Sequence, residues 1–290
     1  MMKVSGFTIV KNAVKFDYPI VEAITSILPL CDEFIVNVGH YDDGTLELIQ
    51  AINSPKIKII QHNWDDTLRE GGKLLAVETN RAFDAVSADS HWVFYIQADE
   101  VLHEKYLDAV RAAMEEHKHN LHVDGLLFNY THFYGSYDYV GNSRRWYKRE
   151  VRIIRNDKQI RSYRDAQGFR KNDEKLRVKQ IDATMFHYGW VKPPKAQQEK
   201  QKSFHKMWHD DAQVKKMTSE ANEFDYDTID SLVGFKETHP SVMQKRIQQQ
   251  NWHFTFDTSK INLSIKDKLL MYVEKKTGWR VGEYRNFKTI

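Results

Sequence analysis

The sequence predicts an α/β protein built on a mixed, mainly parallel sheet that is flanked by helices. Strand-like and helix-like segments alternate up to about Val123, and repeated βα units of this kind form parallel sheets covered on both faces. After that point loops separate the strand-like segments, which predicts a mixed sheet. From Ala196 onward the chain is polar and helical. We therefore expect a sheet domain over residues 1–195, with a Rossmann-like first half, and a helical extension over residues 196–290.

The spacing of apolar residues along the chain predicts where the strands and helices lie. Short runs rich in β-branched and aromatic residues predict strands at 4–10, 34–38, 57–61, 92–96, 125–130, 151–155 and 181–186. Apolar residues at helical spacing predict helices at 20–27, 45–52, 74–86 and around 106–114. Asp17 and Pro19 signal the start of the first helix.

Composition excludes several classes of protein. The 290 residues include 43 basic and 40 acidic side chains, so the net charge is only +3, which argues against a nucleic-acid partner. A local basic groove for a phosphorylated ligand stays possible. Cys31 is the single cysteine, which excludes an intrachain disulfide and a thiolate metal cluster. The sequence shows neither a signal peptide nor an apolar membrane span, so we expect a cytoplasmic protein.

Polar residues that directly follow strands are the first candidates for a site, because ligands of such sheets bind beyond the carboxyl ends of the strands. The residues selected by this rule are Asn12, Asp42, Asp43, Asp65, Asp66, Asp99 and Glu100. The pair Asp99 and Glu100, in Gln97-Ala98-Asp99-Glu100, could bind a hard cation that neutralises a diphosphate leaving group. Equally, one of the two could cap the next helix.

Two further segments could complete such a site. His187 leaves an apolar strand and could ligate a metal beside a carboxylate, although a lone histidine is more often structural. Gly71 and Gly72 precede a helix and lie between Arg69 and Lys73, an arrangement that lets backbone amides and cations approach an anion. The same glycines could simply make a turn.

Several of these segments resemble family 2 glycosyltransferases of the GT-A fold. Gln97-Ala98-Asp99-Glu100 resembles the family's Asp-x-Asp motif, with Gln97 in place of the first aspartate. Residues 7–12 are similar to the family's first strand, 38–45 to its acidic stretch, 69–73 to its Gly-Lys segment, and 181–190 to the strand that carries its late histidine.

The resemblance implies an inverting enzyme that uses a nucleotide-diphosphate sugar and Mn²⁺ or Mg²⁺. It makes Asp99 and His187 the metal ligands and puts Gln97 nearer the ribose or an ordered water. The residues that it assigns to the nucleotide sugar are Thr8, Val10, Asn12, Asp42, Arg69, Gly72, Lys73 and Gln97.

An inverting transferase also needs a carboxylate base for the acceptor hydroxyl, and the resemblance implies a position between the acidic motif and the late histidine. Asp165 is our first choice, followed by Asp138 and Glu150, although Asp165 could instead pair with Arg164 or Arg161. For the acceptor, a glycan or a lipid-linked sugar, the aromatic and cationic residues Tyr137, Arg145 and Trp146 are candidates. Such aromatic residues could equally be packed in the core.

The last segment, 259–290, has eight basic and three acidic residues interspersed with apolar ones. It could lie on an anionic membrane, which would give peripheral contact at the inner face, or form a helix packed back on the domain. Two other functions share this general architecture: a sugar-phosphate nucleotidyltransferase, which would need a Gly-rich loop where Lys11-Asn12-Ala13 stands, and a non-catalytic nucleotide-sugar-binding module.

Overall fold

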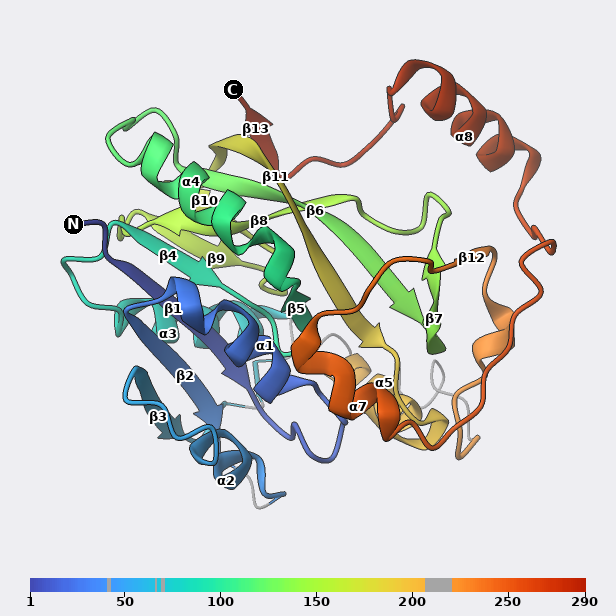
Figure 1. The fold of residues 1–290 in the computed structure, drawn as a ribbon, viewed down its shortest axis with the longest axis horizontal. Coiled ribbons are helices and arrows are strands. Elements are labelled where there is room, and N and C mark those ends of the chain that lie inside the picture. Colours follow the sequence, from blue (N-terminus) through green and yellow to red (C-terminus); the bar gives the residue numbers. More distant parts are fainter. Residues whose placement is uncertain (41–42, 66, 69–70, 207–220) are drawn as a thin grey trace.

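A computed structural model describes residues 1–290 with the exception of 41–42, 66, 69–70 and 207–220 (Figure 1). The strands of the first half are β1 (Val4–Val10), β2 (Glu33–Gly39), β3 (Ile57–His62), β4 (Trp92–Tyr95) and β5 (Glu100–Leu102). The helices between and after them are α1 (Ile20–Ile27), α2 (Thr45–Gln50), α3 (Lys73–Asp84) and α4 (Leu107–His117). These bounds differ by only a few residues from the sequence-based ones, except that the short strand β5 was not predicted.

The second half adds longer strands. They are β6 (Gly125–Tyr134), β7 (Ser136–Gly141), β8 (Arg149–Arg155), β9 (Ile160–Tyr163), β10 (Gly168–Lys171) and β11 (Glu174–Trp190). The chain then forms α5 (Pro194–Lys206), β12 (Leu232–Gly234), α7 (Gln244–Gln248), α8 (Ile265–Thr277) and β13 (Phe287–Thr289).

All the described strands belong to one sheet, whose main path runs β3-β2-β1-β4-β8-β6-β11-β10-β9. The β3-β2-β1-β4 half is parallel throughout. In the rest of this path, every pair is antiparallel except the parallel β6–β11 pair. The predicted fold class, an α/β GT-A arrangement with a mixed sheet flanked by helices, is confirmed at the level of architecture.

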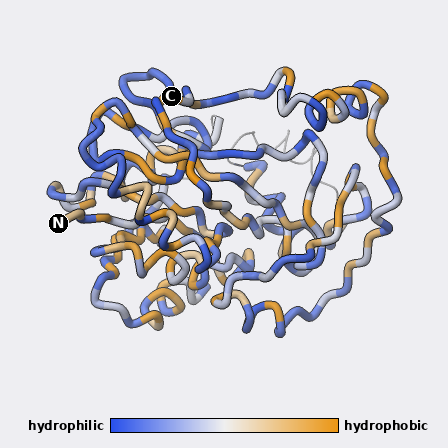
Figure 2. Tube along the Cα trace, turned by 45° about the horizontal axis from the view of Figure 1, so that its top comes forward, coloured by the Kyte–Doolittle hydropathy of each residue, from blue (hydrophilic) through white to orange (hydrophobic). Residues whose placement is uncertain are grey.

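Hydrophobic residues fill both faces of the sheet, because neighbouring side chains of a strand point to opposite sides. On β1, Val10 joins Ile24 of α1 and Val110 of α4 in one cluster. Phe7 joins Phe83 of α3 in the other cluster. The hydropathy colouring shows these apolar strands in the interior (Figure 2).

The region after residue 195 is not purely helical. β12 pairs with β7, and β13 runs parallel to the first part of β11, so both short strands extend the same sheet. The domain boundary near residue 195 stays a prediction. Among the described residues, no helix combines the length and the apolarity that crossing a bilayer requires.

A fully buried ion pair joins the end of the parallel half to the antiparallel half. Arg152 of β8 donates from Nε and Nη2 to the two carboxylate oxygens of Glu100, at 2.8 and 2.7 Å. Tyr130 donates its hydroxyl to the same carboxylate at 2.8 Å. The third Arg152 nitrogen, Nη1, donates to the carbonyl of Gln167, at 3.0 Å. Glu100 therefore fixes the loop after β4 and, through Arg152, the turn before β10.

Removal of one partner from this ion pair should cost far more stability than removal of both. In Arg152→Met the Glu100 carboxylate stays buried without its cation, and we expect a loss of about 3–5 kcal/mol in the free energy of unfolding. The double variant Glu100→Gln with Arg152→Met should recover a large part of that loss. Urea denaturation of the three proteins measures this. A double variant less stable than Arg152→Met would contradict the assigned role.

Candidate functional site

The two predicted metal ligands meet because the segment after β4 pairs with β11. Glu100 of β5 lies opposite His187 in the antiparallel register, and the amide of Tyr188 donates to the carbonyl of Asp99 at 2.8 Å. This pairing places Asp99 Oδ1 3.8 Å from His187 Nε2. Asp99 leads into a strand and not a helix, so the helix-cap alternative does not describe it.

The other oxygen of Asp99 is bound by a lysine. Lys200 of α5 places Nζ 3.1 Å from Oδ2 and 2.9 Å from the carbonyl oxygen of Gly189. Burial by itself would raise the pKa of the Asp99 carboxyl, but the Lys200 ammonium holds it below its usual value. Asp99 is therefore a carboxylate with one oxygen paired and one directed at the histidine.

A chain of hydrogen bonds sets the proton positions on the histidines. His132 Nε2 lies 2.7 Å from the carbonyl oxygen of Tyr147, which can only accept, so Nε2 carries the proton and His132 Nδ1 has a lone pair. His187 Nδ1, 3.2 Å from that lone pair, must then donate to it. Burial lowers the pKa of both rings, which favours their neutral forms. His187 Nε2 therefore presents a lone pair to Asp99.

These two atoms fit a divalent cation. A lone pair and a carboxylate oxygen 3.8 Å apart are both acceptors, and they can share only a positively charged or protonated species between them. Oxygen and imidazole nitrogen bind Mn²⁺ and Mg²⁺ at about 2.0–2.2 Å, so both can reach one ion. A histidine ligand that donates its other ring N–H to a fixed partner is typical of metal sites. No cluster of three His, Cys, Asp or Glu side chains that could hold a metal ion exists within the described ranges.

Gly189 is required for this geometry. A Cβ at this position would lie 2.7 Å from Asp99 Oδ2 and 2.7 Å from His187 Nε2. Real Cβ atoms do not approach other atoms so closely, so any side chain here would push the two candidate ligands apart. Packing therefore explains why a glycine, Gly189, stands two positions after His187.

The residues predicted to contact the nucleotide sugar spread over several elements. Thr8 and Val10 are buried in β1, and Asn12 follows it with a positive φ of 60°. Thr8 Oγ1 and Asn12 Oδ1 are buried and find no hydrogen-bond partner among the described residues. Asp42 and Arg69 lie outside the described residues.

Gly72, Gln97 and Asp165 are brought together by the turn between β9 and β10. Gly72, with φ of 73°, precedes α3 and packs against Asp165: a Cβ on Gly72 would lie 2.8 Å from Asp165 Cα. Gln97 donates to the carbonyl of Ala166 at 3.4 Å. Lys73 is exposed at the first turn of α3. A cavity of about 360 Å³ adjoins this turn, lined by Gly71, Tyr163, Arg164, Asp165, Gln167 and Tyr284.

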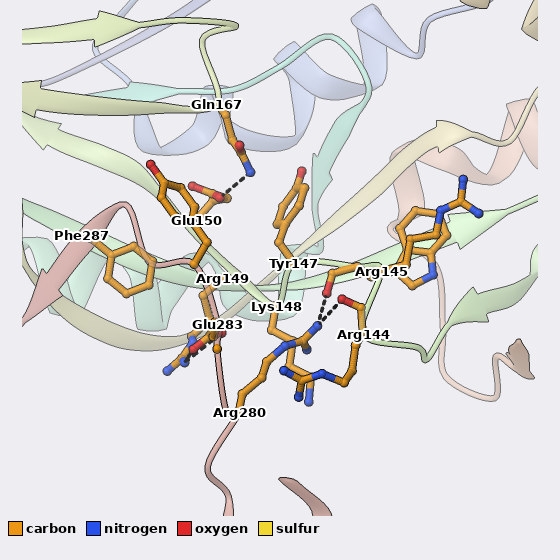
Figure 3. A pocket seen from close by; sticks show the side chains of 13 residues that line it. Arg144, Arg145, Tyr147, Lys148, Arg149, Glu150, Gln167, Arg280, Glu283 and Phe287 are labelled. Atoms are coloured by element: carbon orange, nitrogen blue, oxygen red, sulfur yellow. Dashed lines mark hydrogen bonds and ion pairs between the residues drawn. The ribbon is translucent and has the colours of Figure 1, made fainter. Parts of the chain in front are cut away.

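A second cavity, of about 200 Å³, lies between β8 and the chain after α8 (Figure 3). Arg145 and Trp146, two of the predicted acceptor residues, line it, and Gln167 and Tyr284 line both cavities. Glu150 stands at its inner end, where its carboxylate accepts from Gln167 at 2.8 Å and from Asn286 at 3.1 Å. Burial raises the pKa of Glu150 to about 7. Trp146 is itself largely buried and stacks on His132, with ring centroids 5.2 Å apart.

Two predicted residues lie elsewhere. Tyr137 is only 3% exposed and packs among Tyr188, His239 and Trp252, so its position corresponds to the core-packing alternative. Asp138 is exposed on β7, accepts a hydrogen bond from Ser136, and lines neither of the two cavities.

Sequence reasoning missed His132, Arg152, Lys192 and Lys200. Lys200 is 101 positions from Asp99 and lies in a polar helix, so nothing local marks it. Lys192 is fully buried, donates to the carbonyl of Phe16 at 2.8 Å, and thereby holds the loop after β1. Its pKa is well below the usual range because of this burial. His132 could have been found as the residue opposite His187, had the β6–β11 register been known.

Comparison with known proteins gives resemblances of fold only. No protein-family model and no curated protein sequence matches the chain. Among solved structures, TarS of S. aureus is similar with a TM-score of 0.41 and 16% identity, over 69% of this chain and 38% of the TarS chain.

Two further solved structures illustrate the range of matches. The 4-diphosphocytidyl-2C-methyl-D-erythritol synthase of Anaerococcus prevotii matches with a TM-score of 0.41 and 11% identity, over 66% of this chain and 90% of that one. Glucosyl-3-phosphoglycerate synthase of Mycobacterium tuberculosis, in complex with Mn²⁺ and UDP, matches with a TM-score of 0.32 and 17% identity, over 46% of this chain and 45% of that one. At such values the likeness carries no conclusion about activity.

The raised pKa of Glu150 should make stability depend on pH. The folded state holds this proton up to about pH 7, whereas the unfolded chain releases it near the ordinary value of 4.5, so wild-type stability falls as pH rises between these values. Glu150→Gln should remove this loss. Its melting temperature relative to wild type should therefore increase from pH 4.5 to pH 7 in thermal denaturation. A difference that is constant with pH would show that Glu150 is ionised normally.

Proposed function

We propose that this chain is a glycosyltransferase that moves a sugar from a nucleotide-diphosphate sugar to an acceptor hydroxyl. The observation that carries the proposal is the pair of opposed acceptors, Asp99 Oδ1 and His187 Nε2, at the carboxyl end of β4 in the parallel half of the sheet. Because the 97–100 and 181–190 segments resemble those of family 2 transferases, we interpret this pair as ligands of a metal that binds the donor diphosphate. A diphosphate needs compensating positive charge when it departs, and this edge of the sheet is where such ligands bind.

Asp99 and His187 are the residues that would hold Mn²⁺ or Mg²⁺. When bound, such an ion stabilises the negative charge that develops on the diphosphate. Lys200 keeps Asp99 Oδ2 occupied, so that Oδ1 alone is directed at His187. His132 fixes the His187 ring through Nδ1. Gln97, which carries no charge, would face the ribose or an ordered water.

The donor is proposed to lie along the edge formed by the end of β1, Gln97 and the start of α3. Asn12, half-buried directly after β1, has a side-chain oxygen without a partner among the described residues, which supports this place for a ligand, whereas Thr8 Oγ1 is fully buried within β1. Gly72 brings the backbone before α3 close to the turn that holds Asp165, and Lys73 adds a positive charge at the N-terminus of this helix.

Asp165 is the proposed base for the acceptor hydroxyl, in an inverting displacement. It lines a cavity, next to Gly72 and one residue from the Gln97 contact at Ala166, so it lies between the donor residues and the acceptor cavity. The cavity with Arg145 and Trp146 is proposed to take the acceptor. Gln167 and Tyr284 belong to both cavities, so a molecule in one can approach the other.

Loss of the Asp99 carboxylate should remove both metal binding and transfer. In Asp99→Asn we expect the affinity for Mn²⁺, measured by the electron paramagnetic resonance of free Mn²⁺, to fall by at least about 10-fold. Transfer or donor hydrolysis should fall by at least about 100-fold. Asp108→Asn, an exposed aspartate on α4, is the matched control and should behave like wild type.

Because the Asp99→Asn change leaves the Lys200 ammonium without its carboxylate, the melting temperature must be recorded for each protein. His187→Gln offers a second variant that spares this ion pair, and it too should lose Mn²⁺ affinity. Normal Mn²⁺ binding by both variants would refute the metal site. Wild-type protein that binds a nucleotide sugar but never releases the nucleotide would identify a binding module instead of an enzyme.

Substitution of the proposed base should separate chemistry from binding. Asp165→Asn should reduce kcat by about 100-fold to 10,000-fold, the range for loss of a general base. Donor affinity in isothermal titration calorimetry should change little. Asp173→Asn, in the exposed turn that follows β10, controls for the loss of a charge in this hairpin region. A wild-type kcat in Asp165→Asn would exclude Asp165 as the base, and Glu150 would then be the carboxylate to test.

A further inference from the structure

Helix α8 exposes an apolar face that the described part of the chain leaves uncovered. Ile265, Leu269 and Tyr272 follow one another at helical spacing and are 87%, 62% and 61% exposed. All residues of α8 are described, and none of them is buried. The helix lies at the edge of the molecule in both views (Figures 1 and 2). The helix contacts the domain through other residues, and these three apolar side chains take no part in that contact.

The opposite side of the helix is the one that faces the protein. Glu274, whose side chain is 12% exposed, forms ion pairs with Arg144 at 2.8 Å and Arg280 at 3.5 Å, and it also pairs with Lys148. At about 100° per residue, Glu274 lies roughly half a turn away from the line of Ile265, Leu269 and Tyr272. The Glu274 ion pairs thus orient α8 with its apolar face toward solvent.

Positive charges border the apolar face. Lys266, Lys268, Lys275 and Lys276 are all exposed, whereas the two acids of the helix are turned inward or locally bound. Asp267, the second acid, accepts a hydrogen bond from the Ser264 hydroxyl at 2.6 Å, at the N-cap. The line of Ile265, Leu269 and Tyr272 is therefore flanked by Lys266 on one side and by Lys268 and Lys275 on the other, and Lys276 lies at its C-terminal end.

The residues next to α8 extend this surface. Ile261 before the helix and Trp279 and Tyr284 after it are 55%, 61% and 65% exposed. Tryptophan and tyrosine are the residues that favour the boundary between lipid headgroups and acyl chains. We define the α8 surface as Ile261, Ile265, Leu269, Tyr272 and Trp279 with the four lysines named above.

We propose that the α8 surface docks on an anionic membrane, with the helix lying in the plane of the interface. A basic helix with one apolar face inserts that face into the headgroup region while its lysines meet anionic lipids. A second copy of the chain is the other possible cover, but a symmetric contact would place the lysines of both copies against each other. Charge complementarity therefore favours the lipid surface. This inference does not depend on the proposed transferase activity.

Vesicle flotation tests the proposal with the full chain. Wild type should float with phosphatidylcholine vesicles that contain 30 mol% phosphatidylglycerol and should not float with pure phosphatidylcholine. Leu269→Glu should lower the partition coefficient by about tenfold or more, because it places a charge in the apolar face. Lys268→Gln with Lys275→Gln should lower it by about fivefold for each lysine, and the wild-type value should fall with added salt.

Leu121→Glu is the matched control, because Leu121 is 79% exposed in the loop before β6 and receives the same change. It should float like wild type, and equal melting temperatures should show that all variants fold. The proposal would be overturned if wild type and Leu269→Glu floated equally, or if wild type did not float at all. A dimer in light scattering that Leu269→Glu dissociates would also overturn it and would assign the α8 surface to a second copy.

Discussion

The buried ion pair between Glu100 and Arg152 is the constraint on which the candidate site depends. Both side chains are fully buried, so neither charge could remain there without the other. The pair links three parts of the chain: the loop after β4, strand β8, and the turn before β10 through the Gln167 carbonyl. Because Asp99 and Ala166 belong to two of these parts, the pair sets where the motif and the proposed base stand relative to each other.

The two acids of the 97–100 segment therefore have different tasks. Glu100 neutralises Arg152 in the core, and Asp99 is the carboxylate left at the site, with Lys200 on one oxygen and His187 opposite the other. In the proposed site Gln97 is uncharged, so Asp99 would be the single carboxylate that the protein offers to a metal. We expect metal binding that depends strongly on the diphosphate of the donor, which would supply the remaining ligands and charge.

The proposed acceptor cavity lies next to α8, because the same three cationic residues contact both. Arg144, Lys148 and Arg280 line the cavity and also form the ion pairs that hold Glu274 of α8 (Figure 3). A membrane bound at α8 would thus lie close to the rim of this cavity. If both proposals hold, an acceptor carried by a lipid would reach the cavity from the side on which the protein is docked.

Strands β1 to β4, the helices of the first half and the strand-end position of Asp99 could be predicted from the sequence, but the three-residue strand β5 could not. The resemblance of their segments to family 2 transferases suggested Asp99 and His187 as ligands of one metal. These follow from local periodicity and from short motifs, which need no knowledge of distant contacts. Only the tertiary structure decided that Glu100 is an internal counterion, that Tyr137 is buried, and that Lys200 and His132 belong to the site. The physical reason is that these roles depend on strand register and helix placement between distant parts of the chain: His132 and His187 are 55 positions apart, and Asp99 and Lys200 are 101 apart. The basic and apolar composition of residues 259–290 likewise left open whether this segment contacts a membrane or packs on the domain, and only the fold showed which face of α8 is exposed.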